Sequence, residues 1–133
     1  MFTRFYEISA LTGMTVENSI YNAACKLSEG KYSGGSWQVL VDNEDTFIVY
    51  PEVGDIEVGH VPNYVHPANI TQEAFGAYCC LVVYNQLCWH YHAQGEQDRC
   101  SRFSSMYHSV RNWLLDTDTI PNEDVMHVMK MID

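Results

Sequence analysis

Two cysteines and two histidines in the second half of the chain are the residues whose types most readily suggest chemistry. Cys88, His90, His92 and Cys100 are all ligand types that zinc accepts. On a helix, Cys88 and His92 would share a face at a spacing of four residues, while His90 would point away from it. This spacing matches no closed zinc template. We therefore expect ordinary packing for Cys88 and no cofactor, with a metal site at Cys88, His92 and Cys100 as the alternative.

The remaining thiols offer little support for nucleophilic catalysis. Cys79 and Cys80 lie inside the apolar run Ala74–Tyr84, where burial would raise the pKa of a thiol and leave it inert. Cys25 stands beside Lys26, but no spacing of a base and an orienting residue accompanies any thiol. The sequence also lacks a P-loop, a dinucleotide fingerprint and a nucleophile elbow. These observations predict a protein that is not an enzyme, and a thiol- or zinc-dependent enzyme remains the alternative.

Acidic residues form the second candidate site, and no Lys or Arg lies between Lys31 and Arg99. Three interpretations stay open: a solvated hairpin tip, a site for a hard cation that lacks EF-hand spacing, or a surface that meets a basic partner protein. Arg99 and Arg102 could hold an anion or neutralise these acids within the chain. The set that we call the acidic patch is Asp42, Glu44, Asp45, Glu52, Asp55 and Glu57.

Composition limits the classes of partner. The 133 residues include 7 Lys and Arg against 17 Asp and Glu, for a formal net charge of -10. Nucleic-acid backbones and anionic membranes are bound through basic side chains, so direct binding to either is not expected. The longest apolar run is too short for a membrane span. Five cysteines without a recognisable secretory leader favour the reducing cytoplasm.

Helices are predicted from apolar spacing and capping residues. The first is expected over about Val16–Ser28, with Thr15 as its N-cap and Gly30 as its stop. Two more helices are expected towards the C-terminus, over about Gln97–Leu115 and after Pro121.

The central helix has a different character. Thr71 is its predicted N-cap, and the helix should continue to about His92. Because Ala74–Tyr84 is apolar on all sides, this helix is expected at the buried centre, with Gly76 and Ala77 allowing close packing against the sheet.

Short runs of Val, Ile and aromatic residues predict the strands. Trp37–Val41 and Thr46–Tyr50 flank turn residues that include Asn43 and read as a β-hairpin, and Asp55–His60 alternates as a third strand. The stretch Val61–Asn69 is expected to be a loop. The order predicts a single α+β domain over residues 1–133, in which a small antiparallel sheet, the hairpin plus the third strand, packs against about four helices.

Several of these residues also form an ordered motif. Tyr32-x-Gly34-Gly35-x-Trp37 precedes the hairpin, and Thr71-x-Glu-Ala-x-Gly76 opens the central helix. Val110-Arg111-Asn112-Trp113 and a terminal Ile132-Asp133 follow. In this order the chain, from about Tyr21 to Asp133, resembles the ArdB/KlcA family of antirestriction proteins. It departs at Val39, where the family has an aromatic residue, and at Glu44-Asp45, which replace a Gly-Gly in the hairpin turn.

The resemblance implies a small α+β protein of a plasmid, phage or integrated element that protects incoming DNA from type I restriction in the bacterial cytoplasm. Its partner would be a host defence protein, contacted directly or indirectly, and the acidic patch is the candidate contact. The motif residues Tyr32, Gly34, Gly35, Trp37, Thr71, Gly76 and Arg111 are expected to be mainly structural. An inhibitor of another defence nuclease, such as a CRISPR effector, is the alternative.

Overall fold

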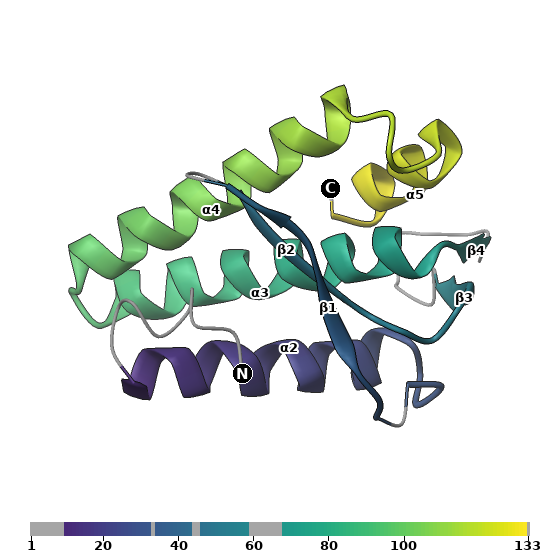
Figure 1. Cartoon of the computed structure of the whole chain (residues 1–133). Coiled ribbons are helices and arrows are strands. Elements are labelled where there is room, and N and C mark those ends of the chain that lie inside the picture. Colours follow the sequence, from purple (N-terminus) through teal and green to yellow (C-terminus); the bar gives the residue numbers. More distant parts are fainter. Residues whose placement is uncertain (1–9, 33, 44–45, 59–67, 133) are drawn as a thin grey trace.

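The described part of the computed structural model, residues 10–32, 34–43, 46–58 and 68–132, forms four helices and two antiparallel two-stranded sheets (Figure 1). Strands and helices are segregated along the chain, so the fold class is α+β, as predicted. No helix in these ranges has the length and apolar character needed to cross a membrane. In chain order the elements are α2 (Ala10–Leu27), β1 (Trp37–Asp42), β2 (Phe47–Pro51), β3 (Ile56–Val58), β4 (Ala68–Ile70), α3 (Gln72–Ala93), α4 (Gln97–Asp116) and α5 (Asn122–Ile132).

Helix α3 is the centre of the structure. It lies between α2 and α4, with the β1–β2 hairpin crossing the helices and α5 near its N-terminal end (Figure 1). Its residues from Ala74 to Leu81 are all buried, including Cys79 and Cys80. This confirms the prediction made from the uninterrupted apolar run, because a helix that is apolar on all sides must be covered on all sides.

One face of α3 meets strand β2 at very short range. At Gly76 an ideal Cβ would overlap the carbonyl oxygen of Val49 and the Cβ of Tyr50. One and two turns further along, the thiol of Cys80 lies 3.8 Å from the carbonyl oxygen of Val49, and the hydroxyl of Tyr84 donates to the carbonyl of Phe47 at 2.9 Å. The absence of a side chain at Gly76 thus sets the distance between helix and strand, as expected.

The hairpin has an inner and an outer strand. Trp37 pairs with Pro51 and Asp42 with Phe47, and the register shifts between Val39 and Val41 at a β-bulge. Strand β2 is mostly buried, while the residues of β1 are half-buried or exposed. Asn43 closes the turn through two hydrogen bonds to Thr46. The Asn43 side-chain oxygen accepts from the Thr46 backbone amide at 2.8 Å, and the Asn43 backbone amide donates to the Thr46 carbonyl at 3.0 Å.

The third predicted strand exists but pairs differently. Ile56–Val58 forms β3, and its partner is β4, not the hairpin. The expectation that Ala68 and Asn69 belong to a loop was therefore wrong, whereas residues 59–67 lie outside the described ranges. The physical reason is burial: Ile56, Val58 and Ile70 all enter the core, and backbone groups buried alongside them must be paired.

The start of the first helix was also predicted wrongly. Helix α2 begins at Ala10, so Thr15 lies inside it and is not its N-cap. Thr12 is buried, which indicates that packing of this early turn outweighs the local preference of Thr for a cap. The predicted end is confirmed, because Gly30 has a positive φ of 82° and its amide donates to the Cys25 carbonyl at 2.8 Å.

Candidate functional site

The glycine pair of the N-terminal motif forms the connection between α2 and β1. Gly34 and Gly35 have φ values of 122° and 124°, a region that residues with a side chain rarely occupy. The indole Nε1 of Trp37 donates to the hydroxyl of Tyr32 at 2.6 Å, and the two rings meet edge to face. Trp37 also contacts the ring of Tyr21 in α2, with centroids 5.6 Å apart. These contacts fix the position of β1 relative to α2, so they give Tyr32 and Trp37 a structural role.

The second motif closes the N-terminus of α3. Thr71 is its N-cap, as predicted, and the Thr71 hydroxyl accepts from the amide of Ala74 at 3.3 Å. The amide of Thr71 in turn donates to the carboxylate of Asp124 at 2.9 Å. Arg111 lies half-buried on α4. Thr71 thus connects the start of α3 to α5, and Gly76 allows α3 to pack against β2.

The four described members of the acidic patch do not form one cluster. Asp42 lies at the turn end of the hairpin, opposite Phe47, whereas Glu52 follows Pro51 at the other end. The five residue steps from Phe47 to Glu52, at about 3.3 Å per residue, separate these two acids by roughly 16 Å. Asp55 and Glu57 belong to the β3 region next to Glu52 in the chain. Glu44 and Asp45 lie outside the described residues. The patch therefore divides into a turn end and a strand-exit end.

Glu57 and Glu52 both contact polar side chains of the same chain. Lys31 lies 3.3 Å from Glu57 in an exposed ion pair, and the amide of Gln38 donates to Glu52 at 2.7 Å. The sequence argument that the acids lack a nearby cation is thus wrong for Glu57, because Lys31 comes just before the segment without basic residues. An exposed ion pair of this kind contributes at most about 1 kcal/mol to stability. Glu52 and Asp55, the other two acids at the strand-exit end, are both exposed.

Two of the three candidate metal ligands come together, and the third lies elsewhere. The Sγ atoms of Cys88 and Cys100 are 3.6 Å apart across the α3–α4 pair. The exposed ring of His92 instead meets the ring of Trp89 edge to face, with centroids 5.7 Å apart. Within the described ranges, no group of three or more Cys, His, Asp or Glu is placed to hold a metal ion. What the structure offers at this place is a thiol pair.

The other thiols divide by burial. Cys79 and Cys80 are fully buried, and burial raises the pKa of Cys79 well above its usual value and that of Cys80 to about 11. The thiolate, which is the reactive form, is therefore disfavoured at both positions, as expected. Cys25 is exposed on α2.

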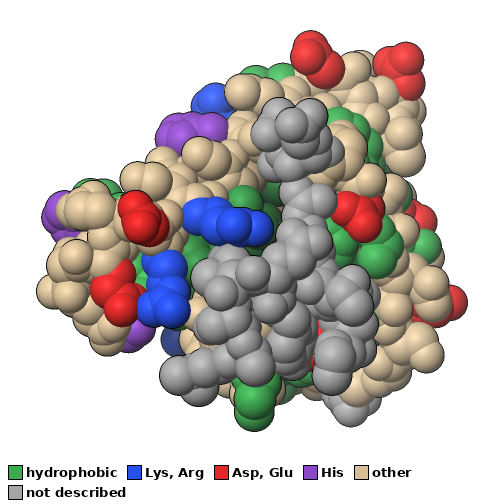
Figure 2. All heavy atoms as spheres, turned by 60° about the vertical axis from the view of Figure 1, so that its left-hand side comes forward, with side chains coloured by type: hydrophobic (Ala, Val, Ile, Leu, Met, Phe, Trp, Pro, Cys, Tyr) green, Lys and Arg blue, Asp and Glu red, His purple; other side chains and the backbone are tan. Residues whose placement is uncertain are grey.

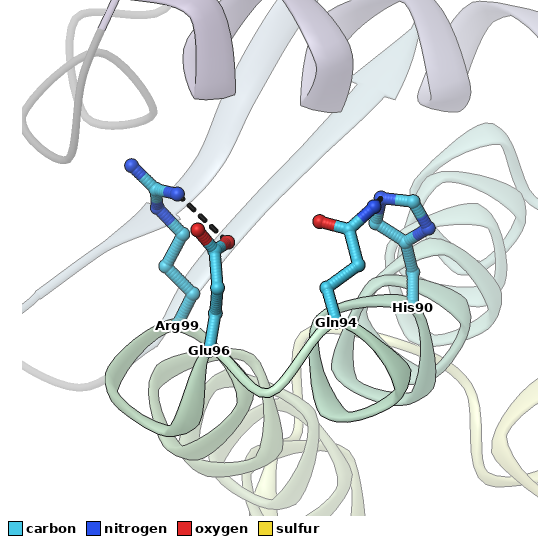
Figure 3. Close-up of polar contacts among 4 residues, drawn as sticks. All are labelled: His90, Gln94, Glu96 and Arg99. Carbon is cyan, nitrogen blue, oxygen red and sulfur yellow. Dashed lines mark hydrogen bonds and ion pairs between the residues drawn. The ribbon is translucent and has the colours of Figure 1, made fainter.

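Arg99 forms an ion pair with Glu96, three residues earlier in the chain. In the connection between α3 and α4, its guanidinium contacts the Glu96 carboxylate at 2.8 Å, while Gln94 lies 3.2 Å from His90 (Figure 3). The Arg99 guanidinium also lies 5.6 Å from the centre of the Tyr91 ring. On this end of the molecule, Lys and Arg side chains lie beside Asp and Glu side chains (Figure 2). For Arg99, neutralisation within the chain is therefore favoured over an anion site.

Comparison with protein families and with curated proteins gives no relative from which residues could be transferred. No protein-family model matches the chain, and no curated protein matches it. The candidate site is the set of exposed acids at the two ends of the hairpin.

Proposed function

We propose that the chain is an antirestriction protein of a phage or other mobile element, which inhibits type I restriction of incoming DNA in the bacterial cytoplasm by binding and not by catalysis. The observation that carries the proposal is the ordered motif from Tyr32 to Trp37 and from Thr71 to Gly76. These residues occupy the two joints of the fold, where α2 meets the hairpin and where α3 begins. A motif at such connections supports the proposal, because residues that fix how elements join are expected to recur among proteins of one fold.

The charge distribution supports a protein partner with a basic surface. Asp42, Glu52 and Asp55 are exposed, and the chain carries a formal net charge of -10. Exposed acids of the acidic patch attract a basic surface over distances of about a Debye length, roughly 8–10 Å at physiological salt. Duplex DNA carries one charge per about 1.7 Å of its axis, a density that separated acids do not reach. A local contact fits this surface better than extended DNA mimicry.

The decisive experiment measures plating of an unmodified phage on a host that carries a type I restriction enzyme. Expression of the protein should raise plating towards the level in a host without the enzyme. Phage grown to carry the host's modification is the control, since its plating should not change. Unchanged restriction at verified expression of folded protein would contradict the proposal.

Charge reversal locates the contact because the two ends of the hairpin are separated. Asp42→Lys alters the turn end, and Glu52→Lys alters the strand-exit end. The double variant E44K/D45K probes the part of the patch outside the described residues. Asp118→Lys is the matched control, because Asp118 is exposed and lies in the α4–α5 connection. Loss of protection in hairpin variants alone assigns the contact to the patch, whereas full activity in all of them moves it elsewhere.

A host with CRISPR immunity provides the second arm of the same assay. The acidic patch could equally contact a basic surface of a CRISPR effector, and this arm of the assay distinguishes the two targets. Protection against CRISPR immunity without protection against restriction would replace the first target by the second. Protection in neither host would contradict inhibition of both systems.

A further inference from the structure

In the described structure, the thiols of Cys88 and Cys100 face each other from two different helices. Cys88 lies in the last turns of α3, and Cys100 lies in the first turn of α4. Their Sγ atoms are 3.6 Å apart, while a disulfide bond has a length of about 2.05 Å. The sulfur atoms need to approach by only about 1.5 Å to reach bonding distance.

The surroundings of the pair allow a small reagent to reach it. Both side chains are half-buried, in contrast to the fully buried Cys79 and Cys80. Burial and the neighbouring Cys100 raise the pKa of Cys88, whereas a hydrogen bond from Ser104 favours its thiolate. Mildly alkaline solution therefore promotes exchange at this site.

We propose that Cys88 and Cys100 form a reversible intramolecular disulfide by exchange with a low-molecular-weight disulfide such as glutathione disulfide. This modification site is independent of the proposed antirestriction activity, because it lies at the α3–α4 connection and not on the hairpin. The bond would close a short loop that already folds back as a helical hairpin, so it ties together two helices that are packed side by side.

The exchange takes place in two balanced steps. One cysteine thiolate attacks a sulfur atom of glutathione disulfide, the S–S bond of the oxidant breaks, and one glutathione leaves as a thiolate. The second cysteine thiolate then attacks the protein sulfur of the mixed disulfide, forms the Cys88–Cys100 bond and releases the second glutathione. The protein loses two protons and two electrons, and the oxidant is reduced to two thiols.

The test uses the full chain with Cys25→Ser, which removes the exposed thiol as a competing site. The folded protein is incubated with glutathione disulfide at increasing ratios to glutathione, then alkylated and analysed by intact mass and peptide mapping. We expect the loss of two hydrogen atoms, a peptide linking Cys88 to Cys100, and full reversal by glutathione. Protein that stays reduced, or that accumulates glutathione adducts without this linked peptide, would overturn the proposal.

Two further variants separate exchange from nonspecific oxidation. In the same background, Cys88→Ser should retain one glutathione on Cys100, and Cys100→Ser should retain one on Cys88, because the resolving thiol is missing. Circular dichroism verifies that each variant is folded. If a variant does not fold, the linkage map of the parent protein still decides. A linked pair that includes Cys79 or Cys80 would contradict the assignment.

Discussion

Gly76 shows how much a single residue position controls in this molecule. The Cβ of any other residue would overlap the Val49 carbonyl and the side chain of Tyr50. Backbone atoms of β2 cannot move aside as the end of a flexible side chain can. Since β2 is buried and paired with β1, an added methyl group must displace the whole hairpin from α3.

We therefore expect Gly76→Ala to lower the free energy of unfolding by about 2 to 3 kcal/mol, in spite of the higher helix propensity of Ala. Urea denaturation followed by far-ultraviolet circular dichroism measures the change. Asn85→Ala is the matched control on the exposed side of α3, where a change within about 0.5 kcal/mol is expected. Equal stabilities of Gly76→Ala and the wild type would show that the helix and strand are further apart than described.

Cys80 makes stability depend on alkaline pH. Burial raises the pKa of its thiol from 9.0 to about 11. Between these values the unfolded chain has lost the proton that the folded chain keeps, so the unfolded state binds fewer protons and stability falls as pH rises. The pKa values of Tyr78 and Cys79 are raised too, by burial first of all, so both act in the same direction.

The expected contribution of Cys80 is a slope of up to about 1.4 kcal/mol per pH unit above pH 9. Denaturation with urea at several values between pH 8 and about pH 11 measures this slope, and Cys80→Ala should make it shallower. Cys25→Ala is the matched control, since it removes a thiol that is exposed in the folded chain. A slope that Cys80→Ala leaves unchanged would assign the pH dependence to other groups.

At the scale of elements, α5 is attached to α3 through one polar contact as well as through its apolar face. Asp124, near the N-terminus of α5, is buried and accepts from the amide of Thr71 at 2.9 Å. An acid in the first turn is favourable for α5 itself, and here it also completes the cap of another helix. No local pattern in the sequence indicates the second role, because Thr71 and Asp124 are 53 residues apart in the chain.

Asp124→Ala should reduce the free energy of unfolding by about 1.5 to 3 kcal/mol, because the partly buried Thr71 amide loses a charged acceptor. Asp124→Asn, which keeps an acceptor oxygen, should lose less. Glu123→Ala is a suitable control, since the neighbouring Glu123 side chain is 86% exposed. The measurement is again urea denaturation, and equal losses for the Ala variants at 123 and 124 would contradict the capping role.

Elements marked by strong local signals were predictable, and contacts between distant segments were not. The uninterrupted apolar run and the Thr71 cap predicted α3 with nearly its observed limits, and the turn residues around Asn43 predicted the hairpin. Strand β4 has only three residues and is defined by its pairing with β3, so no local sequence pattern predicts it. The same holds for the candidate site: Lys31 meets Glu57 and Cys88 meets Cys100 only once the fold brings their elements together.

At the scale of the whole molecule, net charge opposes the compact state. A formal charge of -10 on 133 residues implies mutual repulsion, because 17 acids are opposed by only 7 basic residues. Ion pairs such as Lys31–Glu57 and Arg99–Glu96 offset this repulsion only locally.

We expect the thermal midpoint to rise when sodium chloride is increased from low concentration to about 0.2 M, where the Debye length falls below about 8 Å. A variant with Asp42→Asn and Asp55→Asn, both exposed positions, should show a smaller rise because less repulsion remains to be screened. Differential scanning calorimetry measures both proteins. A midpoint that falls with salt would indicate that attractive pairs dominate the folded state.

The position of α3 also governs which parts of the chain can open on their own. This helix contacts α2, α4, α5 and β2, so separating it from its neighbours disrupts most of the structure at once. Its central amides should therefore exchange with deuterium only when the whole chain unfolds, at a rate set by global stability. Among the described residues strand β1 pairs with β2 alone, and its side chains are half-buried or exposed, so it can open locally more readily than α3. A proposed contact on the hairpin would thus lie on the part of the molecule that can rearrange around a partner while α3 stays closed.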